Sequence, residues 1–324
     1  MIIDFSAHII PKEVGKILVR KHYFGPSGGE EEYLHMYPPE NDDPQYRLLI
    51  MEQFEVDMQL LSGTTPILLG FDKEEASRIS RMTNDYINEL CNKYPNRFVG
   101  CAMISLLDVE SGLEELDRTV GDLGFKCVTI STSHNGRGLD SEEYYPFYER
   151  VIKYDIPVFL HPTHWEGYPL VDMKKGWRAL HIFGWPFDTT QAVWRLIFGG
   201  VLDKFPTLKI VTHHLGGMLP YYRCRIITNV EKVQSLKARL SRPLESYFRQ
   251  IYGDTALNGG PIESLICGYA FFGSERMLFG SDWPFGAPKT LIGENIAGIK
   301  AMPIPKEEKE KILGENAKRL LKIK

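Results

Sequence analysis

The chain has 324 residues, of which 43% are hydrophobic and 25% are charged, and its formal net charge is −4. This size and hydrophobic content suffice for a large core, so we expect a single domain over residues 1–324. A weakly acidic chain without a basic run argues against nucleic acid or an anionic membrane as the main partner. No stretch approaches the roughly 18 apolar residues of a membrane span.

The N-terminus and the cysteines predict the compartment. The first acidic residue is Asp4 and the first basic residue is Lys12, so the N-terminus lacks the basic region of a signal peptide. The five cysteines are odd in number and form no C-x-x-C pair, which is typical of reduced thiols. We therefore expect a cytoplasmic protein.

Several apolar segments along the chain have the composition of buried strands. In chain order they are residues 1–5, 56–62, 97–104, 125–131, 156–161, 208–213, 249–254 and 276–281. Patterns typical of helices lie between some of them, at 73–94, 109–123 and 141–154. Strands interleaved with helices in this way predict an α/β fold, the (β/α)8 TIM barrel. A doubly wound open sheet is the alternative, but it would spread the strand ends along a line.

Two long segments depart from this alternation. Residues 10–45 carry charges and the turn-rich sequence MYPPENDDPQY, and residues 162–190 are rich in aromatic residues and proline. Both are too long for ordinary connections. We expect them to be loop insertions over the face where the strands end, acting as a lid over a substrate. Plain surface insertions are the alternative.

Four predicted strands end on side chains that can bind a metal: His8, His161, the pair His213 and His214, and Asp282. In a parallel barrel the carboxyl ends of the strands form the active-site face, so these side chains would converge. A catalytic metal needs about three protein ligands and one open position. The pattern predicts such a site. The structural alternatives are buried imidazoles that make hydrogen bonds and, for Asp282, a helix N-cap.

Longer phrases of the sequence resemble a known family. They include IIDFSAHIIP, IPVFLHP, GGVLDKFPTLKIVTHHLGGMLP and LFGSDWPFG, and together they extend over nearly the whole chain. They are similar to the amidohydrolase-2 group of metal-dependent barrels, which includes aminocarboxymuconate-semialdehyde, γ-resorcylate and 5-carboxyvanillate decarboxylases. The resemblance implies a homodimer with one divalent metal per barrel, zinc in the first place and manganese as the alternative.

The resemblance also implies roles for single residues. His8, His161 and Asp282 would bind the metal. His214 opens the motif H-x-G-G-x-x-P and would act in acid–base catalysis together with Asp282. Adjacent strand residues face opposite sides, so only one of the two neighbouring histidines should point inward and His213 should be structural.

The first strand departs from the family pattern. Members usually open with D-x-H-x-H or E-x-H, whereas this chain has Ser6 in place of the first ligand, two residues before His8. A serine hydroxyl is a poor zinc ligand beside imidazole or carboxylate. Three outcomes stay open: binding through the other ligands with extra water, weak binding, or loss of the metal.

Other residues are expected around the substrate. Arg47 and Arg225 match by position two arginines that bind substrate in aminocarboxymuconate-semialdehyde decarboxylase, the second of them from the neighbouring subunit. A carboxylate substrate needs such a cationic clamp, although a surface salt bridge is the ordinary role of one arginine. His164 is expected in the pocket or the lid, and Asp254 is a weaker candidate that would support the ligands from behind.

These interpretations give one main functional hypothesis, a metal-dependent non-oxidative decarboxylase of an aromatic or conjugated carboxylic acid. The partner would be a small-molecule carboxylate. A metal-dependent hydrolase or hydratase could use the same site, because fold does not determine chemistry. A metal-poor barrel that serves as a binding subunit is the third hypothesis, and Ser6 is the residue that favours it.

Overall fold

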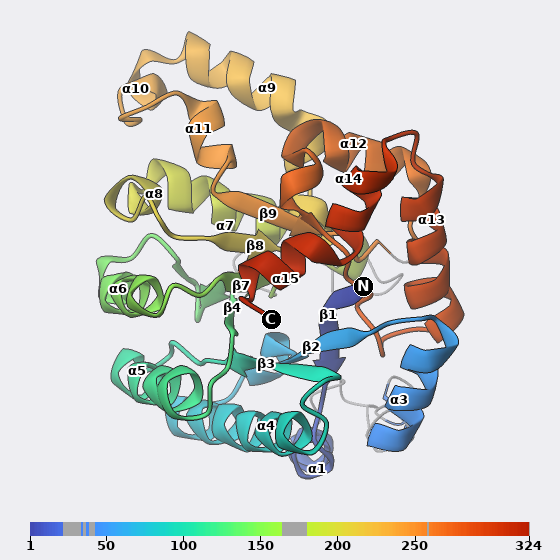
Figure 1. Ribbon diagram of the computed structural model, residues 1–324. Helices are drawn as coiled ribbons and strands as arrows, with labels where there is room; N and C mark the ends of the chain where they lie inside the picture. Colours follow the sequence, from blue (N-terminus) through green and yellow to red (C-terminus); the bar gives the residue numbers. More distant parts are fainter. Residues whose placement is uncertain (22–33, 35–36, 39–42, 164–179, 258, 324) are drawn as a thin grey trace.

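Parallel strands form one eight-stranded sheet in the order β1-β2-β3-β4-β7-β8-β9-β10 (Figure 1). The computed structural model describes residues 1–21, 34, 37–38, 43–163, 180–257 and 259–323. The strands of this sheet are β1 Ile3–Ile9, β2 Met58–Gly63, β3 Phe98–Met103, β4 Cys127–Ser131, β7 Val158–His161, β8 Ile210–Thr212, β9 Ile251–Asp254 and β10 Met277–Leu278. Each falls on a predicted strand, with shifted ends. A short hairpin of β5 (Ser133–His134) and β6 (Arg137–Gly138) stands apart from the sheet.

The chain that follows β10 closes the sheet onto β1. The amide of Phe5 donates to the carbonyl of Phe279 at 2.8 Å, and the amide of Asp282 donates to the carbonyl of Ser6 at 2.8 Å. With this seam the sheet is a (β/α)8 barrel, as predicted, and the open-sheet alternative is excluded. The carboxyl ends of all its strands therefore surround one mouth.

Helices surround the barrel (Figure 1). In chain order they are α1 Lys12–Arg20, α3 Pro44–Gln53, α4 Lys73–Lys93, α5 Val109–Leu116, α6 Tyr145–Tyr154, α7 Trp185–Phe198, α8 Val201–Lys204, α9 Leu219–Lys232, α10 Gln234–Lys237, α11 Leu244–Phe248, α12 Ile262–Phe272, α13 Asn295–Ala301, α14 Lys306–Glu310 and α15 Asn316–Leu320. The predicted helix at 73–94 is α4, and Asp72 caps it by accepting from the amide of Glu75 at 2.8 Å. The predicted helices at 109–123 and 141–154 correspond to α5 and α6, each extended by a π-helical or 3-10 turn.

Aromatic and aliphatic side chains fill the inside of the barrel. Phe5 of β1 contacts Phe159 of β7 edge to face, with ring centroids 5.3 Å apart. These strands are not neighbours in the sheet, so the contact crosses the interior. Leu320, the last residue of α15, and the following Leu321 pack into the same cluster. The interior is thus a packed core, and the polar chemistry is confined to the mouth.

A β-bulge in β1 decides which of its side chains reach the mouth. The pairing with β2 shifts register between Asp4 and Ala7. Phe5 before the shift faces the interior, whereas Ala7 after it packs in the outer core between sheet and helices. The extra residue reverses the alternation of faces. As a result Ser6 and His8 both point into the mouth, as the sequence predicts.

The two predicted insertions are described only in part. Within 10–45 the structure describes α1 and a few further residues. Within 162–190 it describes a π-helical turn, Leu180–Gly184, and the start of α7, a helix that was not predicted. The lid role of both segments stays a prediction. Among the described residues, no helix has both the length and the apolar character that crossing a bilayer requires.

Candidate metal centre and active site

His8 enters the mouth from β1 with both ring nitrogens engaged. Its Nδ1 lies 3.0 Å from the hydroxyl of Ser62 at the end of β2. Its Nε2 lies 3.1 Å from Oδ1 of Asp282. The side chain is buried. The contact with Ser62 orients the ring so that Nε2 faces the centre of the mouth.

His161 is the last residue of β7, and its contacts define its tautomer. Nδ1 lies 2.8 Å from the carbonyl oxygen of Pro162, and a carbonyl can only accept a hydrogen bond. The proton is therefore on Nδ1, and Nε2 carries the lone pair. Burial, together with the nearby His8, lowers the pKa of His161 to about 3. The imidazole is neutral at physiological pH, which is the form that binds metals.

His213 and His214 follow the end of β8, and the structure corrects the prediction that only one of them points inward. The strand ends at Thr212, and His214 and Leu215 adopt left-handed backbone conformations, with φ of 54° and 50°. Strand alternation no longer applies there. The ring of His213 lies 4.6 Å from that of His161, centroid to centroid, and 5.4 Å from that of His214. Both rings therefore belong to the site.

Gly217 ends this turn and permits a close backbone contact. Its φ is 63°, and a Cβ atom there would lie 2.2 Å from the carbonyl oxygen of Pro186. We expect Gly217→Ala to lower the free energy of unfolding by roughly 2–4 kcal/mol, because a backbone clash adds to the strain of the positive φ. Gly124→Ala is the matched control, since φ is 76° and no described atom lies within 4 Å. Strain alone should cost about 1–2 kcal/mol there. Denaturant titrations of both variants test this, and equal losses would contradict it.

Asp254, the last residue of β9, supports the turn from beneath. Its Oδ1 accepts hydrogen bonds from the amides of His214 at 2.8 Å and Ala256 at 3.1 Å. Its Oδ2 lies 3.3 Å from Nδ1 of His213. Burial raises the pKa of this carboxyl to about 6, against the opposing effect of His214. Asp254 thus connects the backbone of the turn to one of its two imidazoles.

Asp282 follows β10 and faces two histidines. Its backbone is left-handed, with φ of 61°, which turns the carboxylate into the mouth. Its Oδ2 lies 3.8 Å from Nε2 of His214, and its Oδ1 is the atom that contacts His8. Burial alone would raise the pKa of Asp282, but His214 and His8 outweigh it and hold that pKa well below its usual range. Burial likewise lowers the pKa of His214, yet the Asp282 carboxylate raises it above its ordinary value overall. The two side chains form an ion pair when His214 is protonated.

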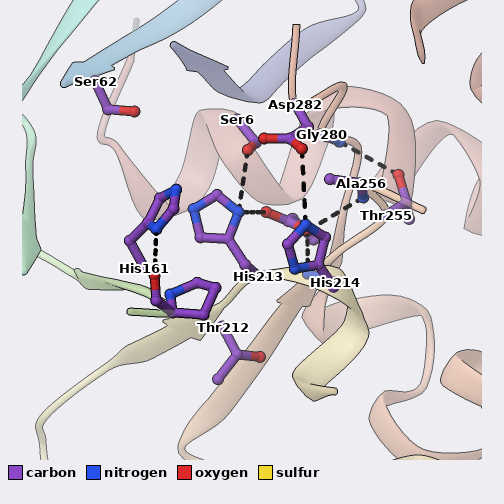
Figure 2. A network of polar contacts seen from close by, with 12 residues as sticks. Ser6, Ser62, His161, Thr212, His213, His214, Thr255, Ala256, Gly280 and Asp282 are labelled. Atoms are coloured by element: carbon purple, nitrogen blue, oxygen red, sulfur yellow. Dashed lines mark hydrogen bonds and ion pairs between the residues drawn. The ribbon is translucent and has the colours of Figure 1, made fainter. Parts of the chain in front are cut away.

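The ligand atoms form two overlapping groups that fit a divalent metal. His8, His161 and His213 make the first group and His213, His214 and Asp282 the second, with the atoms of each group within 4.8 Å of one another. Figure 2 shows His161, His213, His214 and Asp282 turned toward one another, with Ser6 above His213. Nε2 of His213 is buried and has no hydrogen-bond partner among the described residues. Imidazoles beside a carboxylate, one of them with an unpartnered nitrogen, suit zinc and similar divalent ions.

The predicted metal residues are brought together, whereas the predicted substrate residues are placed unevenly. Arg47 is buried, donates to the carbonyl of His8 at 2.8 Å and to Gln59 at 3.0 Å, and stacks on Trp283. Its contacts hold the backbone beneath the site. Arg225 is exposed on α9. His164 lies outside the described residues. Substrate binding by all three stays a prediction.

Comparisons with known proteins agree with this arrangement. The sequence model of the amidohydrolase family matches residues 3–323. The 2-amino-3-carboxymuconate-6-semialdehyde decarboxylase of Dictyostelium discoideum is 30% identical over 279 residues, 85% of this chain and 75% of the relative. A γ-resorcylate decarboxylase of Rhizobium sp. is 30% identical over 298 residues, 86% of each chain. The crystal structure of a dihydroxybenzoic acid decarboxylase from Polaromonas sp., with manganese and the inhibitor 2-nitroresorcinol, superposes with a TM-score of 0.85 at 27% identity, covering 99% of this chain and 97% of that one.

The closed barrel and its histidine- and aspartate-lined mouth define a protein of the metal-dependent (β/α)8 class. The family match over almost the whole length identifies it further: the chain belongs to the amidohydrolase family.

Proposed function

We propose that this protein is a metal-dependent, non-oxidative decarboxylase of an aromatic or conjugated carboxylic acid. The observation that carries the proposal is the cluster of the buried His8, His161 and His213 with the half-buried Asp282 at the mouth of the barrel. Relatives that match most of the chain are decarboxylases of such acids. Their names and this cluster together favour release of CO2 over the hydrolytic and binding alternatives.

His8, His161 and Asp282 are the proposed ligands of a single divalent metal. When bound, the ion would supply positive charge that draws the substrate carboxylate and a neighbouring oxygen into place. We propose zinc as the ion, because imidazole donors suit zinc and divalent zinc binds such sites more tightly than manganese. Manganese is the alternative, and the related Polaromonas structure holds that ion.

His214 and Asp282 are the proposed acid–base pair. Decarboxylation breaks one carbon–carbon bond, CO2 leaves, and the electron pair that remains on the carbon must be protonated. The Asp282 carboxylate keeps His214 in reach of the protonated state, with their closest atoms 3.8 Å apart. Both side chains are 16% exposed, so a substrate in the mouth can touch them, unlike the fully buried His213. The pair can therefore hold the proton that replaces the carboxylate.

Arg225, Arg47 and His164 are the proposed substrate residues. Arg225 is the better candidate for the clamp, because its side chain is exposed on α9, where Tyr221 is 80% and Tyr222 is 40% exposed. These exposed rings support a homodimer through α9, which would carry Arg225 toward a partner's mouth. Arg47 would act mainly by fixing the His8 backbone, and His164 would complete the lid.

The remaining proposals concern the chain as a whole. One sheet takes in strands from Ile3 to Leu278, which supports a single domain over residues 1–324. All five cysteines are free, which supports a reducing compartment such as the cytoplasm. Residues 10–45 and 162–190 are the proposed lids over the mouth.

Product analysis in heavy water tests the reaction. The purified protein, refilled with zinc or manganese, is incubated with dihydroxybenzoates, carboxyvanillate and muconate-like acids in D2O. We expect one substrate to release one CO2 per turnover and to yield a product with deuterium at the carbon that carried the carboxylate. A product that has instead gained the elements of water would support a hydrolase or hydratase. Saturable binding of these acids without any turnover would support the binding subunit.

A further inference from the structure

We propose that His213 is itself a metal ligand, the third imidazole beside His8 and His161. This rests on the proposed metal-dependent function, and it adds a residue that sequence motifs assign to the fold alone. The three side chains are buried and form a group of potential ligands at the mouth, with ligand atoms within 4.8 Å of one another. The structure thus offers three convergent imidazoles where two were predicted.

The polar contacts of His213 leave one nitrogen for a metal. Nδ1 lies 3.3 Å from Oδ2 of Asp254 and 3.4 Å from the hydroxyl of Ser6 (Figure 2). Nε2 is buried without a hydrogen-bond partner among the described residues. A carboxylate that accepts from one imidazole nitrogen fixes the tautomer and makes the other nitrogen a better ligand. Asp254, His213 and the metal would form a carboxylate–imidazole–metal arrangement of this kind.

The three histidines share this arrangement. His8 is held through Nδ1 by Ser62 at 3.0 Å, and His161 is held through Nδ1 by the carbonyl of Pro162 at 2.8 Å. Nδ1 of each ring is thus in contact with the protein behind the site, and Nε2 of His213 has no hydrogen-bond partner among the described residues. Imidazoles that are held through one nitrogen, from three different strands, are what a preformed metal site requires.

The position of Ser6 explains why a third imidazole ligand is needed. The Ser6 side chain points into the mouth but offers only a neutral hydroxyl, which is a weak ligand for zinc-like ions. Its oxygen touches the His213 ring. His213, entering from the end of β8, supplies an imidazole in the space that a longer side chain at position 6 would reach from β1. The chain thereby keeps its number of strong ligands.

The competing explanation is that His213 is a packed core residue. Its ring stacks on Phe159 with centroids 4.0 Å apart and planes 18° apart, and it contacts Asp254. The planar amide of a glutamine can still pack against Phe159 and donate a hydrogen bond, so it would keep most of a packing role. Metal binding would not, because an amide is a much poorer ligand than imidazole. His213→Gln therefore separates the two roles.

Metal affinity and ligand counting test the proposal without reference to activity. We expect His213→Gln to lower zinc affinity by roughly 100-fold or more in a chelator competition. In the cobalt-substituted protein, proton NMR shows one strongly shifted imidazole N–H signal for each histidine ligand. We expect three signals in the wild type and two in the variant. The control is His134→Gln, because His134 is also buried but belongs to neither ligand group.

A second variant tests the ligand role of His213 if His213→Gln folds poorly. In the double variant His213→Ala with Ser6→His, a new imidazole enters the vacated space, and we expect the third signal and most of the zinc affinity to return. Unchanged affinity and an unchanged number of signals in His213→Gln would overturn the ligand role while leaving the decarboxylase proposal intact. A wild type that binds none of zinc, cobalt and manganese would overturn both.

Discussion

Asp282→Asn is expected to lower kcat/KM for CO2 release by on the order of 1000-fold and to lower the metal content as well. Its carboxylate serves two groups at once, with Oδ1 3.1 Å from His8 and Oδ2 3.8 Å from His214. An asparagine keeps the shape but removes the charge that would bind the metal and stabilise the protonated imidazole. Steady-state kinetics with metal analysis of the same sample measure both consequences.

A matched control separates this loss from a general effect of removing a carboxylate. Asp57 precedes β2 at the opposite end of the barrel, and its side chain is 51% exposed and pairs with the N-terminus. Asp57→Asn should leave kcat/KM within about twofold, since exposed ion pairs contribute little. Full activity of Asp282→Asn with a normal metal content would contradict the account of the site.

His214→Gln is expected to lower kcat by roughly 100- to 10,000-fold while metal content stays near that of the wild type. The imidazole is paired with Asp282 and is not one of the proposed metal ligands. Its loss should therefore remove proton transfer and spare the metal. The separation of kcat from metal content distinguishes this variant from Asp282→Asn, in which both should fall.

The measurement for His214→Gln is single-turnover CO2 release with elemental analysis. His134→Gln serves again as the control for the loss of a buried or half-buried imidazole. If His214→Gln lost the metal as completely as Asp282→Asn, His214 would be a ligand and the proton would need another donor. If its kcat stayed within a few fold of the wild type, the proposed acid–base pair would be wrong.

The barrel could be predicted from the sequence because its strands are buried on both faces. Segments such as 125–131 and 156–161 are continuous runs of β-prone apolar residues, and β4 and β7 lie within them. The convergence of His8, His161 and Asp282 followed from the rule that parallel barrels place chemistry at strand ends. These parts rest on periodicity and topology, which a single sequence carries.

The position of His213 could not be predicted in the same way. The alternation rule holds only within a strand, and β8 ends at Thr212, one residue earlier than a reading of the apolar run suggests. Because the backbone at His214 is left-handed, the rings of His213 and His214 both face the mouth. The glycines at 216 and 217 were the available signal, because glycine pairs permit such tight turns.

Arg47 shows a second limit of sequence reasoning. A cation near a carboxylate-binding site suggests a clamp, but its guanidinium is buried against the carbonyl of His8 and the ring of Trp283. Which partners an arginine finds depends on how α3 packs against β1, and no local pattern encodes that packing. The helix α7 was not predicted either, because its first residues are aromatic and proline-rich and were assigned to the loop insertion at 162–190.

Metal removal and refilling, with CO2 release measured on the same samples, tests the central claim most directly. The account predicts about one divalent ion per chain, no CO2 release after chelation, and recovery of the rate in proportion to the zinc or manganese restored. Undiminished CO2 release from the metal-free protein would contradict it.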